Sequence, residues 1–271
     1  MTTWLDVLIE CSKKIRRDVL PLFGSVEAAI GFGIGAGGDV MKRIDLAAEK
    51  ALIDTVQNLD MSCTLISEES GVKKLGSTPA DYFLTTDPVD GTTNAVRGLP
   101  FIATSIAVSK TTYLKDVEVA LVSDLFHDIT YTASRDGGAH KNGKAIQSSS
   151  TPTLEGAVVG VDLSAVRRKE SITPLLGLLQ KIEHFRHLGA NALELCYVAD
   201  GTTDAFVDLR GKLRVTDIAA ASLILREAGG VMVSLKGEEL NAPLTTTQKV
   251  SFISAANTSL LEDIQELISL E

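Results

Sequence analysis

The chain has 271 residues, of which 45% are hydrophobic and 23% are charged, as in ordinary globular proteins. Its 26 Lys and Arg residues against 35 Asp and Glu residues give a formal net charge of −9. This charge disfavours a nucleic-acid partner, because phosphate polymers are bound through clustered cationic side chains. A small phosphorylated substrate is still compatible, provided that cations bridge the two negative partners.

The amino-terminal segment carries charged residues where a signal peptide needs an apolar core. No uncharged stretch reaches the ~18 residues of a membrane span. The three cysteines, Cys11, Cys63 and Cys196, are scattered and form no paired motif, so we expect buried, reduced thiols. These features predict a soluble cytoplasmic protein with no membrane partner.

Hydrophobic periodicity predicts two amphipathic helices, over residues 4–20 and 43–58, separated by a glycine-rich loop at 31–39. The pair Asn142-Gly143 is the strongest short signal for a β-hairpin. This half of the chain therefore predicts an α+β arrangement. Its expected strands lie at 64–67, 82–86, 102–109, 117–122 and 129–133.

A polar stretch at 145–153 predicts the junction between two domains, residues 1–148 and 149–271. Beyond it, strand and helix patterns alternate as in α/β proteins. Ser259 and Glu262 have the spacing of a capping box, which predicts a final helix. The expected fold class is α/β, with an α+β first half and an α/β second half. The expected elements of the second half are strands near 157–161, 205–208 and 231–234 and helices near 173–182, 191–200 and 217–227.

The glycine-rich loop contains Gly33-x-Gly35-x-x-Gly38, which matches the bare dinucleotide-binding fingerprint. That fingerprint requires a strand before it and a helix that opens at its glycines. Here a helical pattern and Pro21 precede the loop, and the Gly-Lys-Ser/Thr of a P-loop is missing. We therefore expect a simple connection, or a lid that brings Asp39 over a site.

The most informative segment is TTDPVDGTTN, from Thr85 to Asn94. Asp87 follows a β-like run, and open α/β folds place ligand chemistry at such strand ends. Asp90 lies three residues on, and Gly91 begins a Gly-Thr-Thr run whose backbone N–H groups can bind an anion. Each part is also common in turns and helix caps, but two carboxylates beside an anion site suit Mg²⁺.

Three further segments place acids at the ends of expected elements. Glu68 follows a β-like run, Asp217 opens a helix rich in alanines that permit close packing, and Asp45 lies in the first turns of the second helix. Each has a structural alternative. Glu68 could mark a solvated strand end, Asp217 could be a helix N-cap, and Asp45 could complement the helix dipole.

Together these segments resemble the inositol monophosphatase-like family of Mg²⁺-dependent, lithium-sensitive sugar phosphatases. DPVDGTTN matches the first family signature, and VTDIAAASLILREAGG matches the second, in which tryptophan usually stands where this chain has Thr216. The segments SEES, GGAHKNGKAI and LGANALELCYVADGTTDAF match further family segments in the same order. The resemblance implies a layered αβαβα sandwich and a homodimer.

The resemblance also implies two or three Mg²⁺ ions per subunit, which Mn²⁺ could replace. It assigns them to the side chains of Glu68, Asp87, Asp90 and Asp217 and to the carbonyl oxygen of Val89. Asp39 is similar to the acid that recruits a third, weaker ion in archaeal relatives.

Catalytic roles follow from the same resemblance. Asp45 and the Thr92 hydroxyl are similar to the pair that orients and deprotonates the attacking water, and Glu68 belongs to the catalytic set. Asp90 and the backbone of Gly91 and Thr92 would contact the phosphorylated substrate.

Further substrate contacts are implied for Gly189, Ala190, Asp208 and Ser164, in segments that align with those contacting the substrate hydroxyls. The segment VDLRGKLRVTD is longer than in the animal enzymes and resembles the archaeal enzymes that hydrolyse both inositol monophosphate and fructose 1,6-bisphosphate. Our hypothesis is that Arg210 or Arg214, helped by Arg186, holds the second phosphate, since guanidinium binds phosphate bidentately. Arginines that merely balance nearby acids are the alternative.

The predicted function is Mg²⁺-dependent hydrolysis of inositol monophosphate and fructose 1,6-bisphosphate, in which metal-activated water attacks the phosphate ester. One alternative is a phosphatase of 3′-phosphoadenosine 5′-phosphate or inositol polyphosphates. Another is a non-enzymatic regulatory protein, for which the complete acidic set would not be required.

Overall fold

The computed structural model describes residues 2–164 and 172–268. The elements of the first half are α1 (Trp4–Val19), β1 (Gly31–Ile34), β2 (Val40–Lys42), α2 (Arg43–Asn58), β3 (Cys63–Ser67), β4 (Gly71–Leu75), β5 (Phe83–Asp90), α3 (Thr92–Arg97), β6 (Ala103–Ser109), β7 (Val117–Asp124), β8 (Ile129–Ser134), β9 (Ala139–Lys141) and β10 (Lys144–Ala145). Those of the second half are β11 (Val158–Val161), α5 (Leu176–Lys181), β12 (His184–Arg186), α6 (Asn191–Ala199), β13 (Ala205–Arg214), α7 (Val215–Glu227), β14 (Val231–Val233), β15 (Lys249–Ala255) and α8 (Thr258–Leu267).

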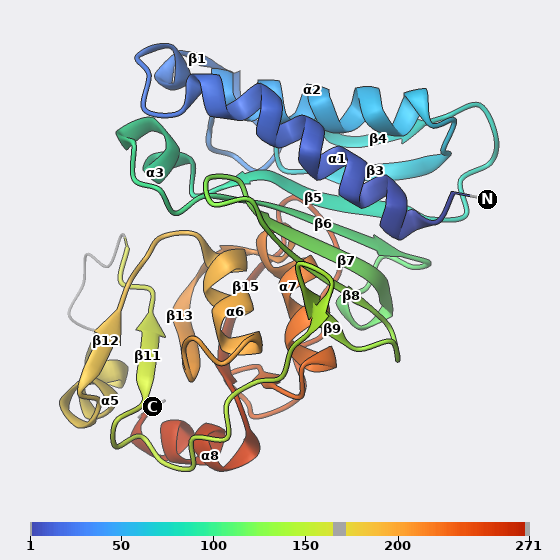
Figure 1. The fold of residues 1–271 in the computed structure, drawn as a ribbon. Coiled ribbons are helices and arrows are strands. Elements are labelled where there is room, and N and C mark those ends of the chain that lie inside the picture. The colour runs from blue at the N-terminus through green and yellow to red at the C-terminus, as the bar shows by residue number, and fades with distance from the viewer. Residues whose placement is uncertain (1, 165–171, 269–271) are drawn as a thin grey trace.

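Two β-sheets separate three layers of helices (Figure 1). The first half forms an eight-stranded sheet in the order β10-β9-β8-β7-β6-β5-β3-β4, and the second half forms a five-stranded sheet in the order β12-β11-β13-β15-β14. Helices α1 and α2 pack on the outer face of the large sheet, α6 and α7 lie between the sheets, and α5 and α8 cover the smaller sheet. The α/β class and the αβαβα sandwich expected from the sequence are confirmed.

The outer helices form where the hydrophobic spacing predicted them. Thr3 and Asp6 form a capping box at the start of α1, and the apolar face of that helix is fully buried against α2 and the large sheet. All three cysteines are free and buried, as expected, and burial raises the pKa of the Cys11 and Cys63 thiols to about 12.

The middle helical layer is buried on two faces. Helix α7 contacts strands β5 to β9 on one side and β13 and β14 on the other. Its alanines Ala219, Ala220 and Ala221 are all fully buried, which confirms that small side chains permit close packing at this position. Because the chain enters α7 directly from β13, the start of this helix is held firmly in place.

Several elements differ from the sequence-based predictions. The segment 31–39, expected to be a loop, contributes strand β1 to an antiparallel hairpin with β2. Strands β12 and β15 were not predicted, because pairing with strands distant in the sequence stabilises them rather than a strong local pattern. Strand β4 was also not predicted, because its middle residues are exposed and give no hydrophobic pattern, although it forms a hairpin with the neighbouring β3. The final helix is capped by Asn257, which accepts a hydrogen bond from the Leu260 N–H, whereas the Ser259 hydroxyl donates to the carbonyl of Pro152.

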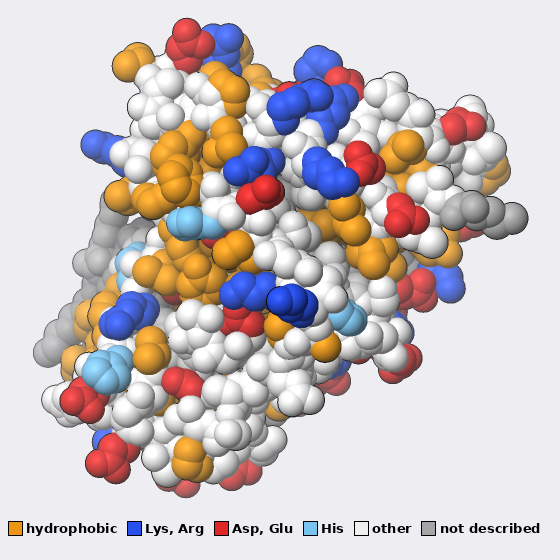
Figure 2. All heavy atoms as spheres, viewed as in Figure 1, with side chains coloured by type: hydrophobic (Ala, Val, Ile, Leu, Met, Phe, Trp, Pro, Cys, Tyr) orange, Lys and Arg blue, Asp and Glu red, His pale blue; other side chains and the backbone are white. Residues whose placement is uncertain are grey.

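Each sheet lies within one of the two predicted domains, but the buried core between the sheets combines residues of both, such as Tyr131 and Phe206. The division at 148/149 is therefore still a prediction. On the face shown in Figure 2, acidic and basic side chains are interspersed with hydrophobic ones. In the described part of the chain, no helix is both long and apolar enough to cross a membrane.

Replacing Ala220 by leucine should lower the free energy of unfolding by about 1–3 kcal/mol, because the larger side chain has no room between two sheets. Urea unfolding measures the change, and Arg226→Ala, at an exposed position of the same helix, is the control. An Ala220→Leu protein as stable as the wild type would contradict the close packing of α7.

Candidate functional site

A cavity of about 580 Å³ opens where strands β3 and β5 end and helices α3, α6 and α7 begin. Strands β3 and β5 are parallel neighbours, and Ser67 lies opposite Thr86. Glu68 and Asp87, the next residues of the two strands, therefore lie at the same edge of the sheet. The cavity is lined by Asp39, Val40, Lys42, Asp45, Glu68, Glu69, Asp87, Val89, Asp90, Gly91, Thr92, Thr93, Ser164, Gly189, Asn191, Arg214 and Asp217.

Three of these acids converge on one point. Carboxylate oxygens of Glu68, Asp87 and Asp217 all lie within 4.8 Å of one another, and all three side chains are buried. Asp217 reaches this point from the first turn of α7, where it accepts hydrogen bonds from the Arg214 N–H (3.2 Å) and the Thr216 hydroxyl (3.0 Å). Asp217 thus caps the helix and also faces the cavity.

Asp90 is held by the start of α6, the second helix between the two sheets. Its carboxylate accepts hydrogen bonds from the Asn191 N–H (3.1 Å) and the Ala192 N–H (2.7 Å), at the start of α6. The ladder between β5 and β6 shifts register between Asp87 and Asp90, as at a β-bulge, where side chains are redirected. The two aspartates of DPVDGTTN therefore lie on one cavity wall with different partners.

Burial is the main cause of unusual proton affinity in this cluster. Burial first, and then the neighbouring carboxylate of Asp217, raise the pKa of Glu68 to about 9 and that of Asp90 to about 8. Burial is also the main reason that the pKa values of Asp87 and Asp217 are raised. A set of buried, all-oxygen ligands that repel one another is suited to a hard divalent cation such as Mg²⁺.

One arginine lies within the acidic cluster. The guanidinium of Arg214 hydrogen-bonds to Glu68 and to Asp39 (2.6 Å), and its Nε lies 3.7 Å from a carboxylate oxygen of Asp217. Asp39 belongs to the turn between β1 and β2, which folds over the cavity. A single positive charge thus faces several carboxylates.

Asp45 and Thr92 meet in the wall of the same cavity. The Thr92 hydroxyl lies 3.1 Å from the Asp45 carboxylate and 3.0 Å from the carbonyl oxygen of Val89. Asp45 also accepts a hydrogen bond from the Lys42 N–H (2.9 Å), and burial raises its pKa to about 6. At neutral pH this carboxylate is mostly ionised and can accept a proton.

Position 91 requires glycine, because its backbone has a positive φ and its surroundings leave no room for a side chain. Its φ is +85°, and an added Cβ would lie 3.0 Å from the Phe101 carbonyl oxygen and 3.1 Å from the Ala190 Cβ. The backbone of Gly189 lies against the same point, so Gly91 and Gly189 bring the start of α3 close to the start of α6.

Some candidates lie behind the cavity rather than in its wall. The Arg210 guanidinium binds Asp208 (2.6 and 3.0 Å), Asp162 (2.5 Å) and the Ser164 hydroxyl. Asp208 and Ala190 are fully buried, and neither they nor Arg210 line the cavity, whereas Ser164 does. Arg186 is exposed on β12, where it donates to the Phe185 carbonyl.

Sequence reasoning missed several residues that shape the site. Lys42 and Asn191 line the cavity, and Asp162 fixes Arg210. Glu194 accepts hydrogen bonds from the Leu188 and Gly189 N–H groups, which orders the loop before α6. Asp162 follows strand β11 directly, so its place at a strand end was the signal that could have identified it.

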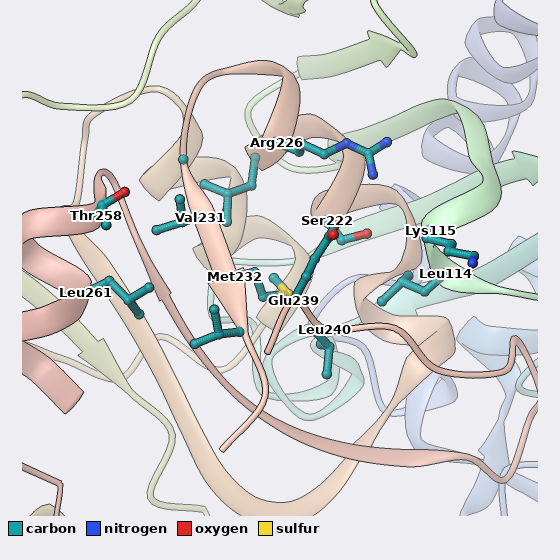
Figure 3. Close-up of a pocket in the computed structure, with 13 residues that line it drawn as sticks. Leu114, Lys115, Ser222, Arg226, Val231, Met232, Glu239, Leu240, Thr258 and Leu261 are labelled. Carbon is teal, nitrogen blue, oxygen red and sulfur yellow. The ribbon is translucent and has the colours of Figure 1, made fainter. Parts of the chain in front are cut away.

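A second cavity, of about 330 Å³, lies at the far end of α7 (Figure 3). Met232, Val231 and Leu240 give it a largely apolar wall, and Glu239 is its only carboxylate among the described residues. No group of converging acids lies there, so the carboxylate-lined cavity is the better candidate for phosphate chemistry.

Residues 6–269 match the model of the inositol monophosphatase family. The chain belongs to this family. It is 36% identical to "Fructose-1,6-bisphosphatase/inositol-1-monophosphatase" of Methanothermobacter thermautotrophicus over 98% of this chain and 97% of the relative. It is 34% identical to "Bifunctional NADP phosphatase/NAD kinase" of Methanococcus maripaludis over 92% of this chain and 46% of that protein. A crystal structure titled inositol monophosphatase–fructose 1,6-bisphosphatase superposes with a TM-score of 0.84 at 29% identity, covering 98% of this chain and 100% of that one.

Without divalent metal, the protein should lose stability as the pH rises from 6 to 8. Glu68 and Asp90 have pKa values of about 9 and 8 in the folded chain, far above the ordinary values of these side chains in an unfolded chain. At a pH between the ordinary and the raised pKa values, the folded state binds more protons than the unfolded state, so raising the pH favours unfolding.

Thermal unfolding in EDTA and in Mg²⁺ at both pH values tests this expectation. Mg²⁺ should raise the Tm more at pH 8 than at pH 6, because at pH 8 it neutralises carboxylates that are losing their protons. An EDTA-treated protein whose Tm rises from pH 6 to 8 would contradict the repulsion inferred for this cluster.

Proposed function

We propose that the chain is a Mg²⁺-dependent phosphatase that hydrolyses inositol monophosphate and fructose 1,6-bisphosphate. The observation that carries the proposal is the convergence of Glu68, Asp87 and Asp217 in the cavity that also holds the Asp45–Thr92 pair. Membership of the inositol monophosphatase family supports phosphomonoester chemistry at this site.

The residues that would hold Mg²⁺, or Mn²⁺ in its place, are Glu68, Asp87, Asp90, Asp217 and the Val89 carbonyl oxygen. Asp39, the sequence-based candidate for a third ion, is a 75% exposed carboxylate at the cavity that is paired with Arg214. When bound, the ions supply the positive charge that a phosphate ester needs in this acidic cavity and lower the pKa of water.

The chain's own residues orient and deprotonate the nucleophile. The Thr92 hydroxyl donates to Asp45 or Val89, which leaves its oxygen free to accept a hydrogen bond from a water molecule. Asp45, whose pKa is about 6, takes the proton as the water attacks phosphorus in line. The bond from phosphorus to the ester oxygen breaks on the opposite side, and the sugar alkoxide leaves with a proton from solvent water. No covalent phosphoenzyme is part of this proposal.

Substrate selection would rest on the rim of the cavity. Ser164, Gly189 and Asn191 line it and offer polar groups to sugar hydroxyls. Arg214 is the one of our three candidate arginines that lines the cavity, so it is the best placed for a second phosphate. Arg210, bound by Asp162 and Asp208, would act indirectly through Ser164. A cytoplasmic homodimer is part of the same proposal.

Asp45→Asn should lower kcat about 10²- to 10⁴-fold, because the amide cannot accept a proton. Its Tm should change little, since an asparagine oxygen can still accept from Lys42 N–H. Asp54→Asn, on the solvent side of the same helix, is the matched control and should keep full activity. An Asp45→Asn enzyme with normal kcat would remove Asp45 from the catalytic pair.

Phosphate release from a panel of esters tests the substrate. With Mg²⁺, and with and without Li⁺, the panel contains inositol 1-phosphate, fructose 1,6-bisphosphate, 3′-phosphoadenosine 5′-phosphate and NADP. We expect the first two to have the highest kcat/KM, and Asp90→Asn to abolish release from both. Preference for NADP would favour the activity named for the Methanococcus relative. Release from none of the esters would contradict an enzymatic role.

A further inference from the structure

Arg214 bridges acids from three separate parts of the chain. It is the last residue of β13, and its guanidinium reaches Glu68 after β3, Asp39 in the β1–β2 turn and Asp217 in α7. Its side chain is only 14% exposed, and Glu68 and Asp217 are buried as well, so these two contacts are made largely out of water, whereas the contact with Asp39 is at the surface. Ion pairs in such surroundings are much stronger than pairs on the surface.

Two of those acids also belong to the proposed metal site. Glu68 and Asp217 offer oxygens within 4.8 Å of each other and of Asp87, and Arg214 already interacts with both acids. A guanidinium hydrogen-bonded to Glu68 and a divalent ion bound to the same carboxylate would place two positive charges on one carboxylate, where they repel each other. The two cations therefore compete for one set of oxygens.

The hydrogen bonding of Arg214 is incomplete. Its Nε is buried without a hydrogen-bond partner, since the nearest Asp217 oxygen is 3.7 Å away. A buried donor without a partner is costly, and most buried polar groups in proteins are hydrogen-bonded. By contrast, Arg210 uses its Nε and both terminal nitrogens on Asp208, Asp162 and Ser164.

Arg214 also holds the turn over the cavity. The β1–β2 hairpin has only two strands, and its Ile34 and Val40 are 68% and 54% exposed, so little apolar burial stabilises it. Its turn is attached through the Gly37 N–H to the Glu68 carbonyl (2.7 Å), the Ala36 N–H to the Glu69 carbonyl (3.0 Å) and Asp39 to Arg214. An added Cβ at Gly37 would lie 2.9 Å from Glu68 and 3.2 Å from Arg214, so the turn packs directly on this pair.

We propose that Arg214 is the internal counter-cation of the metal-free carboxylate cluster, that it competes with the divalent ion, and that Asp39 holds it in the competing position. The inference rests on the proposed metal site. Metal entry then requires Arg214 to leave Glu68, which loosens its hold on Asp39 and on the turn. The released guanidinium is left at the cavity wall, where a substrate phosphate can receive it.

If Asp39 retains Arg214, its effect on metal affinity is the opposite of the effect of a metal ligand. As a ligand, or as a nearby negative charge, Asp39 would strengthen metal binding, and Asp39→Asn would weaken it. As the partner that retains Arg214, Asp39 would weaken metal binding, and Asp39→Asn would tighten it. This second effect must vanish when Arg214 is absent.

A double-mutant cycle on the full-length protein measures whether Asp39 strengthens or weakens metal binding, and whether this effect depends on Arg214. Mn²⁺ affinity is determined by calorimetry without substrate for the wild type, Arg214→Met, Asp39→Asn and the double variant. We expect Arg214→Met to bind Mn²⁺ at least about tenfold more tightly, the scale of one charged hydrogen-bonded pair. Asp39→Asn should tighten binding about two- to fivefold in the wild-type background and should not tighten it in the Arg214→Met background.

Arg226→Met is the control, because it removes the same charge from the exposed far end of α7 and should leave Mn²⁺ affinity within about twofold. Unchanged or weaker binding by Arg214→Met would overturn the competition. Weaker binding by Asp39→Asn in both backgrounds would overturn the retaining role. If Arg214→Met does not fold, the Asp39→Asn variant alone still tests the proposal. Tighter Mn²⁺ binding supports the retaining role of Asp39, and weaker binding contradicts it. A wild-type protein that binds no Mn²⁺ would overturn the proposed metal site itself.

Discussion

Repulsion among buried carboxylates is the constraint on which the rest of this site depends. Burial alone raises the pKa values of Glu68, Asp87, Asp90 and Asp217, and each acid makes its neighbours harder to ionise. Surface acids would spread apart to avoid this cost, but these acids are fixed by strand ends and helix starts. The cluster therefore needs positive charge, and Arg214 is the one cation that hydrogen-bonds directly to it among the described residues. A divalent ion is the natural complement of such an arrangement.

The layered fold is what keeps the acids together. Parallel pairing of β3 and β5 brings Glu68 and Asp87 to one edge, while α6 and α7 begin there from the layer between the sheets. Helix starts carry partial positive charge, so Asp90 at α6 and Asp217 at α7 are favoured even without metal. Close packing of small residues such as Ala220 prevents α7 from moving away. Stability of the inner layer and precision of the site thus have the same origin.

Local patterns predicted the parts of the site that depend on local structure. The helices at 4–20 and 43–58, and the acids that follow or open an element, could be found because caps, strand ends and hydrophobic spacing extend over only a few residues. Strand β15 and the attachment of Arg210 to Asp162 could not, since each depends on pairing between distant segments. The β1–β2 hairpin is local, but its glycine-rich first strand has no strand-like hydrophobic pattern. The resemblance to a family supplied the link between distant acids that periodicity alone does not contain.

Arg210 and Arg214 show why residue type and position in sequence were insufficient to assign the arginines. Both lie on β13, four residues apart, and both are paired with acids. Arg210 lies between Asp162 and Asp208, two acids outside the convergent cluster, and its donors are fully used, so it has no reason to move. Arg214 shares its acids with the proposed metal site and keeps one donor unpaired. A fixed ion pair stabilises one arrangement, whereas an incompletely satisfied one can be exchanged for another cation, and this difference separates a supporting arginine from one that can respond to metal and substrate.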